Sequence, residues 1–308
     1  MRLTGIVLLV LLAASPVIAQ QDAATKHTQS FPATTPSPAA TQPTLSQEQI
    51  RALIRLCANN DLENDKKQRD YTYVERQLEQ RLDGKGNVKS TETKTYDVLE
   101  IYGEQVQKLI AKDDKPLSAK DAQKEDEKIQ KLIDKRKNES DSDREKRLKK
   151  EEKDRQDELQ FVGEVADAYN FKFVGIEQLD GRDNYVIDGE PKPGYQPVHK
   201  DAKILTKTRF RAWIDKDDSQ VKKLDVQFID DVSFGLILFK LHKGAHAIIE
   251  TTRVNDEVWL QRHVVVTADV RVALVKNFDV AMDITDRDYK KFRANTRIVP
   301  IGDLQASH

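Results

Sequence analysis

Apolar and polar residues alternate along much of the second half of the chain, which predicts half-buried β-strands. The clearest alternation spans two stretches separated by a polar turn, with apolar members Phe210, Ala212, Ile214, Leu224, Val226 and Phe228. Alternate residues on paired strands share a face, so these residues are expected to form one apolar wall. Shorter alternations, divided by turn signals such as Asp83-Gly84 and Asp180-Gly181, predict about nine to eleven antiparallel strands in all.

A helical period precedes the first of these strands. Ser46 and Gln49 have the spacing of a capping box, the reciprocal hydrogen-bond pair that begins many helices. The residues that follow place one apolar face at positions i, i+3, i+4 and i+7, namely Ile50, Leu53, Ile54 and Cys57. The pattern predicts a helix that begins after Ser46 and ends near residues 59–60.

A charged region at residues 118–160 interrupts the strand pattern. Residues 112–158 contain sixteen basic and sixteen acidic residues, and many of them stand four apart with the acid first, which supports a helix. Ser118 is a suitable N-cap. Few apolar residues lie between 133 and 148, so that part is expected to project into solvent, whereas Val162 and Ala166 return to the core. A coiled-coil arm is the alternative, but it needs apolar heptads that this region lacks.

The N-terminus has the three parts of a secretory signal. Arg2 precedes an apolar stretch at residues 6–14, and small residues then favour cleavage between Ala19 and Gln20. The apolar stretch is too short to cross a bilayer as a helix, so the mature protein is expected not to span a membrane and to work in the periplasm or outside the cell.

Composition divides the remainder of the chain. Residues 20–45 are rich in Pro, Thr, Gln and Ala and predict a disordered tether. One domain is expected at 46–300, with the charged helical insertion inside it and a short tail at 301–308. The net charge of −1 argues against nucleic acid as a partner. The single cysteine, Cys57, excludes an internal disulfide; we expect a buried apolar residue there, and a reactive thiol is the alternative.

Several short segments resemble the outer-membrane lipoprotein carrier (LolA-like) superfamily. The first are Arg211-Ala212-Trp213-Ile214-Asp215 and Val221-Lys222-Lys223-Leu224. Others resemble a less studied group of secreted relatives, and they are Val232-Ser233-Phe234-Gly235, Lys243-Gly244, Glu257-Val258-Trp259-Leu260 and Asp288-Tyr289-Lys290-Lys291-Phe292. The resemblance covers about residues 65–292 and implies an α+β fold: a curved antiparallel half-barrel closed by helices over an apolar concavity. In that superfamily the concavity receives acyl chains. The charged insertion and the tether are departures from the carriers.

The chain has no recognisable catalytic signature. A Gly-rich phosphate loop and a Gly-x-Ser-x-Gly motif are both absent. The best metal-binding candidates are His242, His246, Glu250 and His263, since even spacing on a strand places residues on one face. Gly244 interrupts that spacing, so neither a metal nor a cofactor is predicted, and no residue is assigned to catalysis. Trp213 and Trp259 suggest ligand stacking, but packing is the simpler interpretation of a tryptophan in an amphipathic strand.

Three functions are compatible with these features. The first is a secreted, non-enzymatic binding protein for an apolar small molecule, a lipid or an acyl chain, with the apolar wall as its site. The alternative is an envelope structural or interaction protein that contacts a protein partner through the charged helices. A metal-dependent hydrolase is the remote third possibility. The inner face of the sheet distinguishes the first two, because a binder needs apolar surface that its own helices do not cover.

Overall fold

The computed structural model describes residues 44–102, 104–234, 239–272 and 276–292. Thirteen strands form one sheet, and they are β1 (Tyr71–Leu82), β2 (Val88–Ile101), β3 (Glu104–Lys112), β4 (Lys115–Pro116), β5 (Tyr169–Leu179), β6 (Arg182–Pro191), β7 (Thr208–Asp215), β8 (Val221–Phe228), β9 (Val232–Phe234), β10 (Phe239–Leu241), β11 (His246–Val254), β12 (Val258–Val272) and β13 (Lys276–Lys291). The predicted cleavage site at Ala19 and Gln20, most of the tether and the tail lie outside the described residues.

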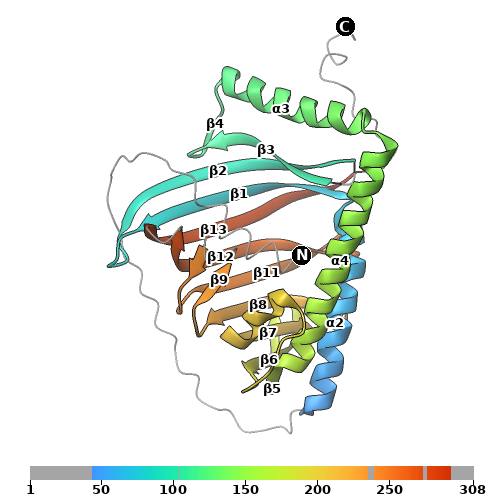
Figure 1. Ribbon diagram of the computed structural model, residues 1–308, viewed down its shortest axis with the longest axis vertical. Coiled ribbons are helices and arrows are strands. Elements are labelled where there is room, and N and C mark those ends of the chain that lie inside the picture. Colours follow the sequence, from blue (N-terminus) through green and yellow to red (C-terminus); the bar gives the residue numbers. More distant parts are fainter. Residues whose placement is uncertain (1–43, 103, 235–238, 273–275, 293–308) are drawn as a thin grey trace.

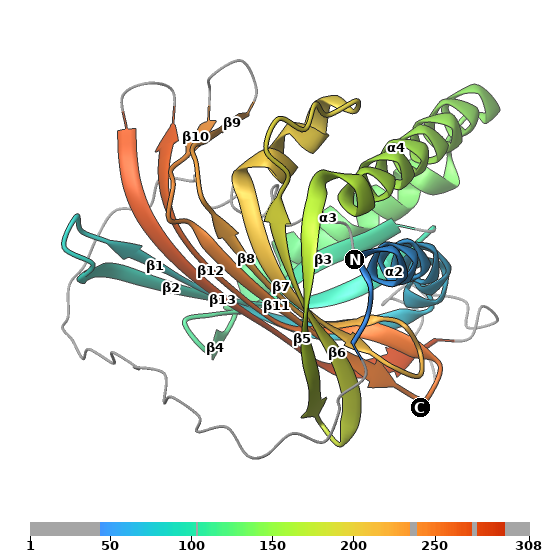
Figure 2. The same ribbon diagram turned by 90° about the horizontal axis from the view of Figure 1, so that it is seen from below.

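The sheet is antiparallel, curved and open, which confirms the predicted fold class (Figures 1 and 2). Its strands follow the order β4-β3-β2-β1-β13-β12-β11-β8-β7-β6-β5, with β10 paired to β12 and β9 paired to β10. The N-terminal strands thus join the C-terminal strands at the centre, through the β1–β13 pair. The strand number exceeds the predicted nine to eleven because β4, β9 and β10 contain only two or three residues each.

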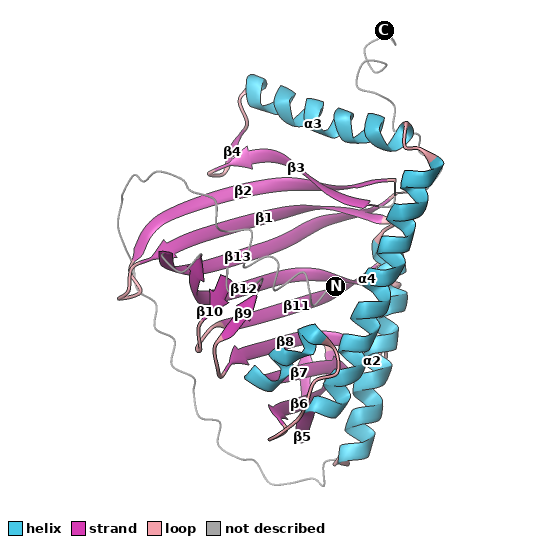
Figure 3. Ribbon diagram, in the orientation of Figure 1, coloured by secondary structure: helices cyan, strands magenta, loops and turns pink. Residues whose placement is uncertain are grey.

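Three α-helices and one 3₁₀ helix lie on one side of the described part of this sheet (Figure 2). They are α2 (Gln47–Gln68), α3 (Ala119–Lys137), α4 (Asp141–Ala168) and η1 (Lys200–Lys207). Helices α2 and α4 run side by side near one end of the strands, and the strands extend well beyond them (Figure 3). No helix of the described residues has the length and apolar character needed to cross a membrane.

The predicted start of α2 is confirmed, but its predicted end is wrong. Ser46 and Gln49 form both hydrogen bonds of the capping box. The helix continues past residues 59–60 to Gln68, because polar side chains bind it to the sheet. The Asn64 amide donates to the carbonyl of Trp259 at 2.6 Å and accepts from its N–H at 2.8 Å. These partners lie far along the sequence, so a local apolar period does not reveal them.

The charged region forms α3 and α4, with Ser118 and Ser140 as N-caps. The expectation that residues 133–148 project into solvent is wrong at two arginines. Arg136 and Arg147, with side chains only 15 % and 18 % exposed, share Glu104 of β3 and Glu139 in a compact ion cluster. The cluster binds the junction of α3 and α4 to the sheet, so these charges are used within the protein.

Helix α2 also covers a free backbone position at one edge of the sheet. Strand β5 is the last in the order, and no strand of the described residues pairs with its other side. The Gln47 side chain accepts from the N–H of Phe171 at 3.1 Å and donates to the carbonyl of the same residue. One side-chain amide therefore satisfies both backbone groups that a neighbouring strand would otherwise satisfy.

Candidate functional site

The strand register places two rows of side chains across the helix-bearing side of the sheet. The first row runs from β5 to β2 through Phe173, Ile187, Ala212, Leu224, Ile249, Val264, Ile284, Gln77 and Lys94. The second runs beside it through Phe171, Gly189, Phe210, Val226, Ala247, Val266, Met282, Glu79 and Glu92. Both rows are apolar from β5 to β13 and become polar at β1 and β2.

Helices cover the β5–β7 end of these rows. We call this part the helix-covered core; its sheet residues Phe171, Ile187, Ala212 and Ile214 pack with Ile50, Ile54 and Cys57 of α2 and Phe161 of α4. Ala212 and Ile214 are 2 % and 0 % exposed. The ring of Phe210 lies over Gly189, where an added Cβ would stand 2.5 Å from the ring. This half of the predicted wall is occupied by the protein's own packing.

A second apolar cluster lies on strands β10–β13, beside β8 in the sheet, and it includes no described helix residue. We call it the helix-free cluster; its buried members are Leu241, Ala245, Ala247, Ile249, Val264, Val266, Ala268, Val270, Val280, Met282 and Ile284. Leu224 and Phe228 pack against it from β8, and half-buried Val226 pairs with Ala247. The register therefore brings all the predicted wall positions of β7 and β8 to one face. The wall residues of β7 lie in the helix-covered core, whereas those of β8 lie beside the helix-free cluster.

The rows end in a polar border on β1 and β2. Gln77 and Glu79 follow Ile284 and Met282 in the rows, and they precede Lys94 and Glu92. Glu79 pairs with Arg81 at 3.3 Å, and Lys94 pairs with Glu92 at 2.9 Å. The side chains of these two ion pairs are partly buried, between 17 % and 29 % exposed. One face of the sheet thus has a broad apolar part and a charged margin.

A buried pair of carboxyl groups lies beside this border. Glu75 of β1 faces Asp286 of β13 in register, and the two residues are 7 % and 3 % exposed. Burial raises the pKa of Asp286 to about 8, and the adjacent Glu75 raises it further in the same direction. Burial also raises the pKa of Glu75. In the sequence, both residues look like ordinary polar positions of a strand, so sequence reasoning missed them. Only the register between β1 and β13 places them next to each other.

The register pairs Glu250 with His263, but the four predicted metal candidates do not form a ligand set. His246 and His263 lie on adjacent strands, but each has its own acidic partner, Asp225 at 2.7 Å and Asp283 at 3.1 Å. His242 lies 3.5 Å from Asp231. Glu250 is bound by Lys223 and Arg262. Within the described ranges, no three His, Cys, Asp or Glu side chains form a group that could hold a metal ion.

The other singled-out side chains have structural roles. Trp259 is buried and donates to Asp218 at 2.9 Å. Trp213 donates to Glu177 at 2.7 Å, with the ammonium of Lys223 over its ring. Cys57 is buried in the helix-covered core, and burial raises the pKa of its thiol to about 12. A thiol with so high a pKa is not a nucleophile at neutral pH.

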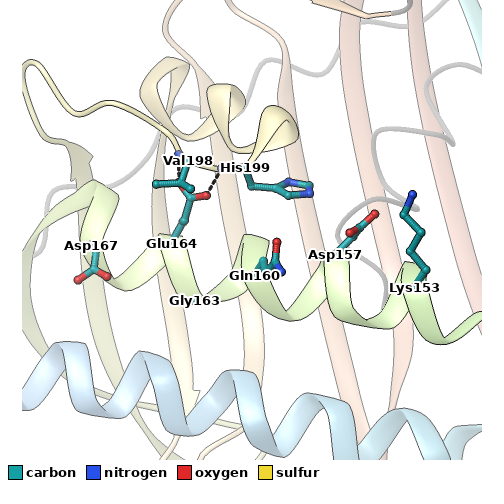
Figure 4. A pocket seen from close by; sticks show the side chains of 8 residues that line it. All are labelled: Lys153, Asp157, Gln160, Gly163, Glu164, Asp167, Val198 and His199. Carbon is teal, nitrogen blue, oxygen red and sulfur yellow. Dashed lines mark hydrogen bonds between the residues drawn. The ribbon is translucent and has the colours of Figure 1, made fainter.

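A pocket of about 620 Å³ lies between α4 and the loop before η1 (Figure 4). Most of its lining residues are polar or charged, among them Lys153, Asp157, Gln160 and Asp167. Glu164 points to the loop and accepts hydrogen bonds from the N–H groups of Val198 and His199 (Figure 4). The hydroxyl of Tyr195 donates to it as well, at 3.0 Å. Glu164 therefore anchors the loop on α4.

No protein-family model and no curated protein matches this sequence. Similar solved structures include a domain from Vibrio parahaemolyticus that is described as a putative outer membrane lipoprotein-sorting protein domain. Its sequence is 11 % identical, the match covers 80 % of this chain and 95 % of that chain, and the TM-score is 0.32. A LolA superfamily protein from Nitrosomonas europaea has 9 % identity, coverages of 79 % and 93 %, and a TM-score of 0.28. Solved structures named for the LolA-like superfamily are therefore among those similar to this chain, as the resemblance of the sequence segments predicted.

A third neighbour is a DUF1329 family protein from Desulfovibrio piger, with 13 % identity, coverages of 80 % and 94 %, and a TM-score of 0.30. Likenesses with TM-scores this low carry no argument about a ligand or partner. The chemistry of this chain has to come from its own residues.

Proposed function

We propose that this protein is exported and, in the periplasm or outside the cell, binds an apolar ligand such as a lipid or acyl chain without catalysing a reaction. One observation carries the proposal: the helix-free cluster extends over β10–β13, with Leu224 and Phe228 of β8 packed against it, and no described helix residue belongs to it although its members are buried. An isolated sheet is stable in water only when something covers its apolar face. In the part of the chain that the structure describes, the helices cover β5–β7 and leave this cluster to another apolar surface.

The energy available on such a face suffices for a simple chain. Each methylene group that leaves water gains about 0.8 kcal/mol. Ten methylenes gain about 8 kcal/mol, from which the costs of association and ordering are subtracted. The proposed contacts are Leu224, Val226 and Phe228 of the predicted wall, with Ala247, Val266 and Met282 beyond them in the second row.

A partner-docking role for the charged helices is the second candidate, and one observation favours it. Residues 141–156 of α4 carry a dense set of charges, and their apolar residue Leu148 is 49 % exposed. Several of these charges already pair along the helix, such as Lys149 with Glu145 and Lys150 with Asp154. The charges therefore stabilise the helix itself, and the apolar face remains the better-supported site.

Binding of a neutral apolar fluorophore, N-phenyl-1-naphthylamine, tests the main proposal. The mature protein is expected to bind it at micromolar concentration and to release it when dodecanol is added. Val226→Trp fills the second row and should weaken binding at least tenfold, while Val174→Trp, at a 41 % exposed position of β5, should leave it unchanged. Thermal unfolding of each variant confirms that the fold persists. Wild-type protein that unfolds cooperatively yet binds no fluorophore would contradict the proposal.

A further inference from the structure

The buried carboxyl pair occupies the place where the apolar face ends. Asp286 follows Ile284 by two residues on β13, and Glu75 precedes Gln77 by two residues on β1. Side chains two apart on a strand share a face and stand about 7 Å apart. The carboxyl groups therefore lie one step beyond the row that contains Ile284 and Val264. The carboxyl pair and the helix-free cluster therefore share one face of the sheet.

The hydrogen bonds of the pair are incomplete and come from neutral groups. Glu75 accepts from the amides of Gln77 at 2.6 Å and Gln107 at 2.7 Å. Asp286 accepts from Gln261 at 3.0 Å through one oxygen, while its other oxygen, Oδ1, is buried and has no partner. Neither carboxyl group forms an ion pair with another described residue. Two buried acids without a cation are costly, and an unsatisfied buried oxygen adds to the cost.

Aromatic rings stand beside the pair. Strand β13 bulges opposite Tyr73, with Asp288 in the left-handed conformation at a φ of 57°. The bulge brings Tyr289 against Tyr73, with ring centroids 5.8 Å apart. Tyr96 follows Glu75 in register on β2. Negative charge on Asp286 and Glu75 adds to burial in raising the pKa of Tyr73, which reflects how close these groups are.

Carboxylates combined with aromatic faces form the chemistry that recognises an ammonium ion. We infer that Glu75 and Asp286, with Tyr73 and Tyr289, bind the ammonium head group of a cationic amphiphile whose chain lies on the helix-free cluster. An ammonium group supplies the missing positive charge and donates a hydrogen bond to the unpartnered oxygen of Asp286. The inference rests on the proposed apolar binding and specifies the class of ligand.

The alternatives fit the pair less well. A divalent metal ion requires more carboxylate or carbonyl ligands than two carboxyl groups supply, and the neighbouring glutamines direct their N–H groups toward the carboxylates. A proton shared between the two carboxyl groups neutralises part of their charge. It does not explain why tyrosines and the apolar face lie beside the pair. The titratable groups around the pair are the three tyrosines. Arg262 lies near Tyr289, and Glu79, Glu92 and Glu125 of α3 lie near Tyr96.

Three probes with the same twelve-carbon chain distinguish the contribution of the head group to binding from that of the chain. They are dodecylammonium, dodecanol and dodecanoate. Calorimetry of the mature protein at pH 7.5, below the micellar concentration of each probe, should give dodecylammonium a Kd at least tenfold below that of dodecanol. Dodecanoate should bind most weakly. Asp286→Asn and Glu75→Gln should each abolish the preference for ammonium and leave the Kd of dodecanol within about threefold. Asp283→Asn is the matched control on the same strand, since Asp283 pairs with His263; it should keep the preference.

Proton release gives a second measurement. Because the pKa of Asp286 lies near 8 in the free protein, binding of a cation at pH 7 should release about one proton, measured by calorimetry in buffers of different ionisation enthalpy. Asp286→Asn should release none. Equal wild-type affinity for dodecylammonium and dodecanol would overturn this inference and leave the proposed function standing, as would a preference retained in both carboxyl variants. Failure to bind any of the three probes would overturn both.

Discussion

Asp286 combines deep burial with an acidic neighbour, and its protonation is therefore coupled to folding. Its pKa is raised to about 8 from an ordinary value of 3.8, first by burial and then by the charge of Glu75. The folded protein consequently keeps a proton between these two pH values that the unfolded chain has released. When the unfolded state binds fewer protons, the free energy of unfolding falls as the pH rises.

We expect wild-type stability to decrease as the pH rises from about 5 to about 8 and to level off above that. One proton accounts for a slope of up to about 1.4 kcal/mol per pH unit. Asp286→Asn removes the titrating group, so the difference in unfolding free energy between variant and wild type should grow in favour of the variant across this range. Urea unfolding at several pH values measures it. Parallel curves for the two proteins would show that Asp286 titrates normally.

At the scale of the elements, α3 is held to the sheet by a few contacts on an otherwise charged surface. Ile129 is 9 % exposed, and Asp126, three residues before it, pairs with Lys108 of β3 at 2.5 Å. Arg136 binds Glu104 at the other end of the helix. These contacts make α3 a cover for the neighbouring edge strands β3 and β4 (Figure 1).

A pair of alanine substitutions tests this arrangement. Ile129→Ala removes buried apolar volume and should cost about 2 kcal/mol of unfolding free energy or more. Leu148→Ala, at a 49 % exposed position of α4, should stay within about 0.5 kcal/mol. Chemical denaturation gives both values. Similar small effects would indicate that α3 contributes nothing to the core, as the sparse apolar content of the region suggests at first sight.

The sequence predicted individual helices and strands better than it predicted which of them contact one another. The alternation at residues 208–214 predicted the buried face of β7, and the capping box at Ser46 predicted the first residue of α2, since both are local patterns. The end of α2 was not predictable, because Asn64 binds the backbone of Trp259 in a distant strand. The carboxyl pair depends in the same way on the β1–β13 register, which no local pattern specifies.

Across the whole molecule, the apolar interior consists of two main clusters with different covers. The helix-covered core combines β5–β7 with α2, α4 and η1, whereas the helix-free cluster includes only strands and a turn of the described residues. Leu224 packs against both clusters and links them. The molecule therefore combines a half closed by its own helices with a half that contains no described helix residue, where we propose that the ligand binds.

Hydrogen exchange should distinguish the two halves. Saturating dodecanol is expected to slow amide exchange in β11 and β12 at least several-fold, since ligand contacts reduce local opening there. Amides of β5 and β6, beneath the helices, should change little. Val226→Trp provides the control and should lose the effect. Slowing confined to β5 and β6, or an effect retained in Val226→Trp, would contradict binding at the helix-free cluster.

The contact between Gln47 and Phe171 has a consequence for self-association. A free sheet edge is a template onto which another chain can add a strand, and repeated addition leads to fibres. At β5 a side-chain amide already occupies the backbone N–H and carbonyl of Phe171, and a bulge between Phe173 and Gly175 interrupts the regular spacing just beyond. An incoming strand would have to displace the first turn of α2 and match an irregular edge. The residue that begins the helix therefore also protects the sheet against polymerisation.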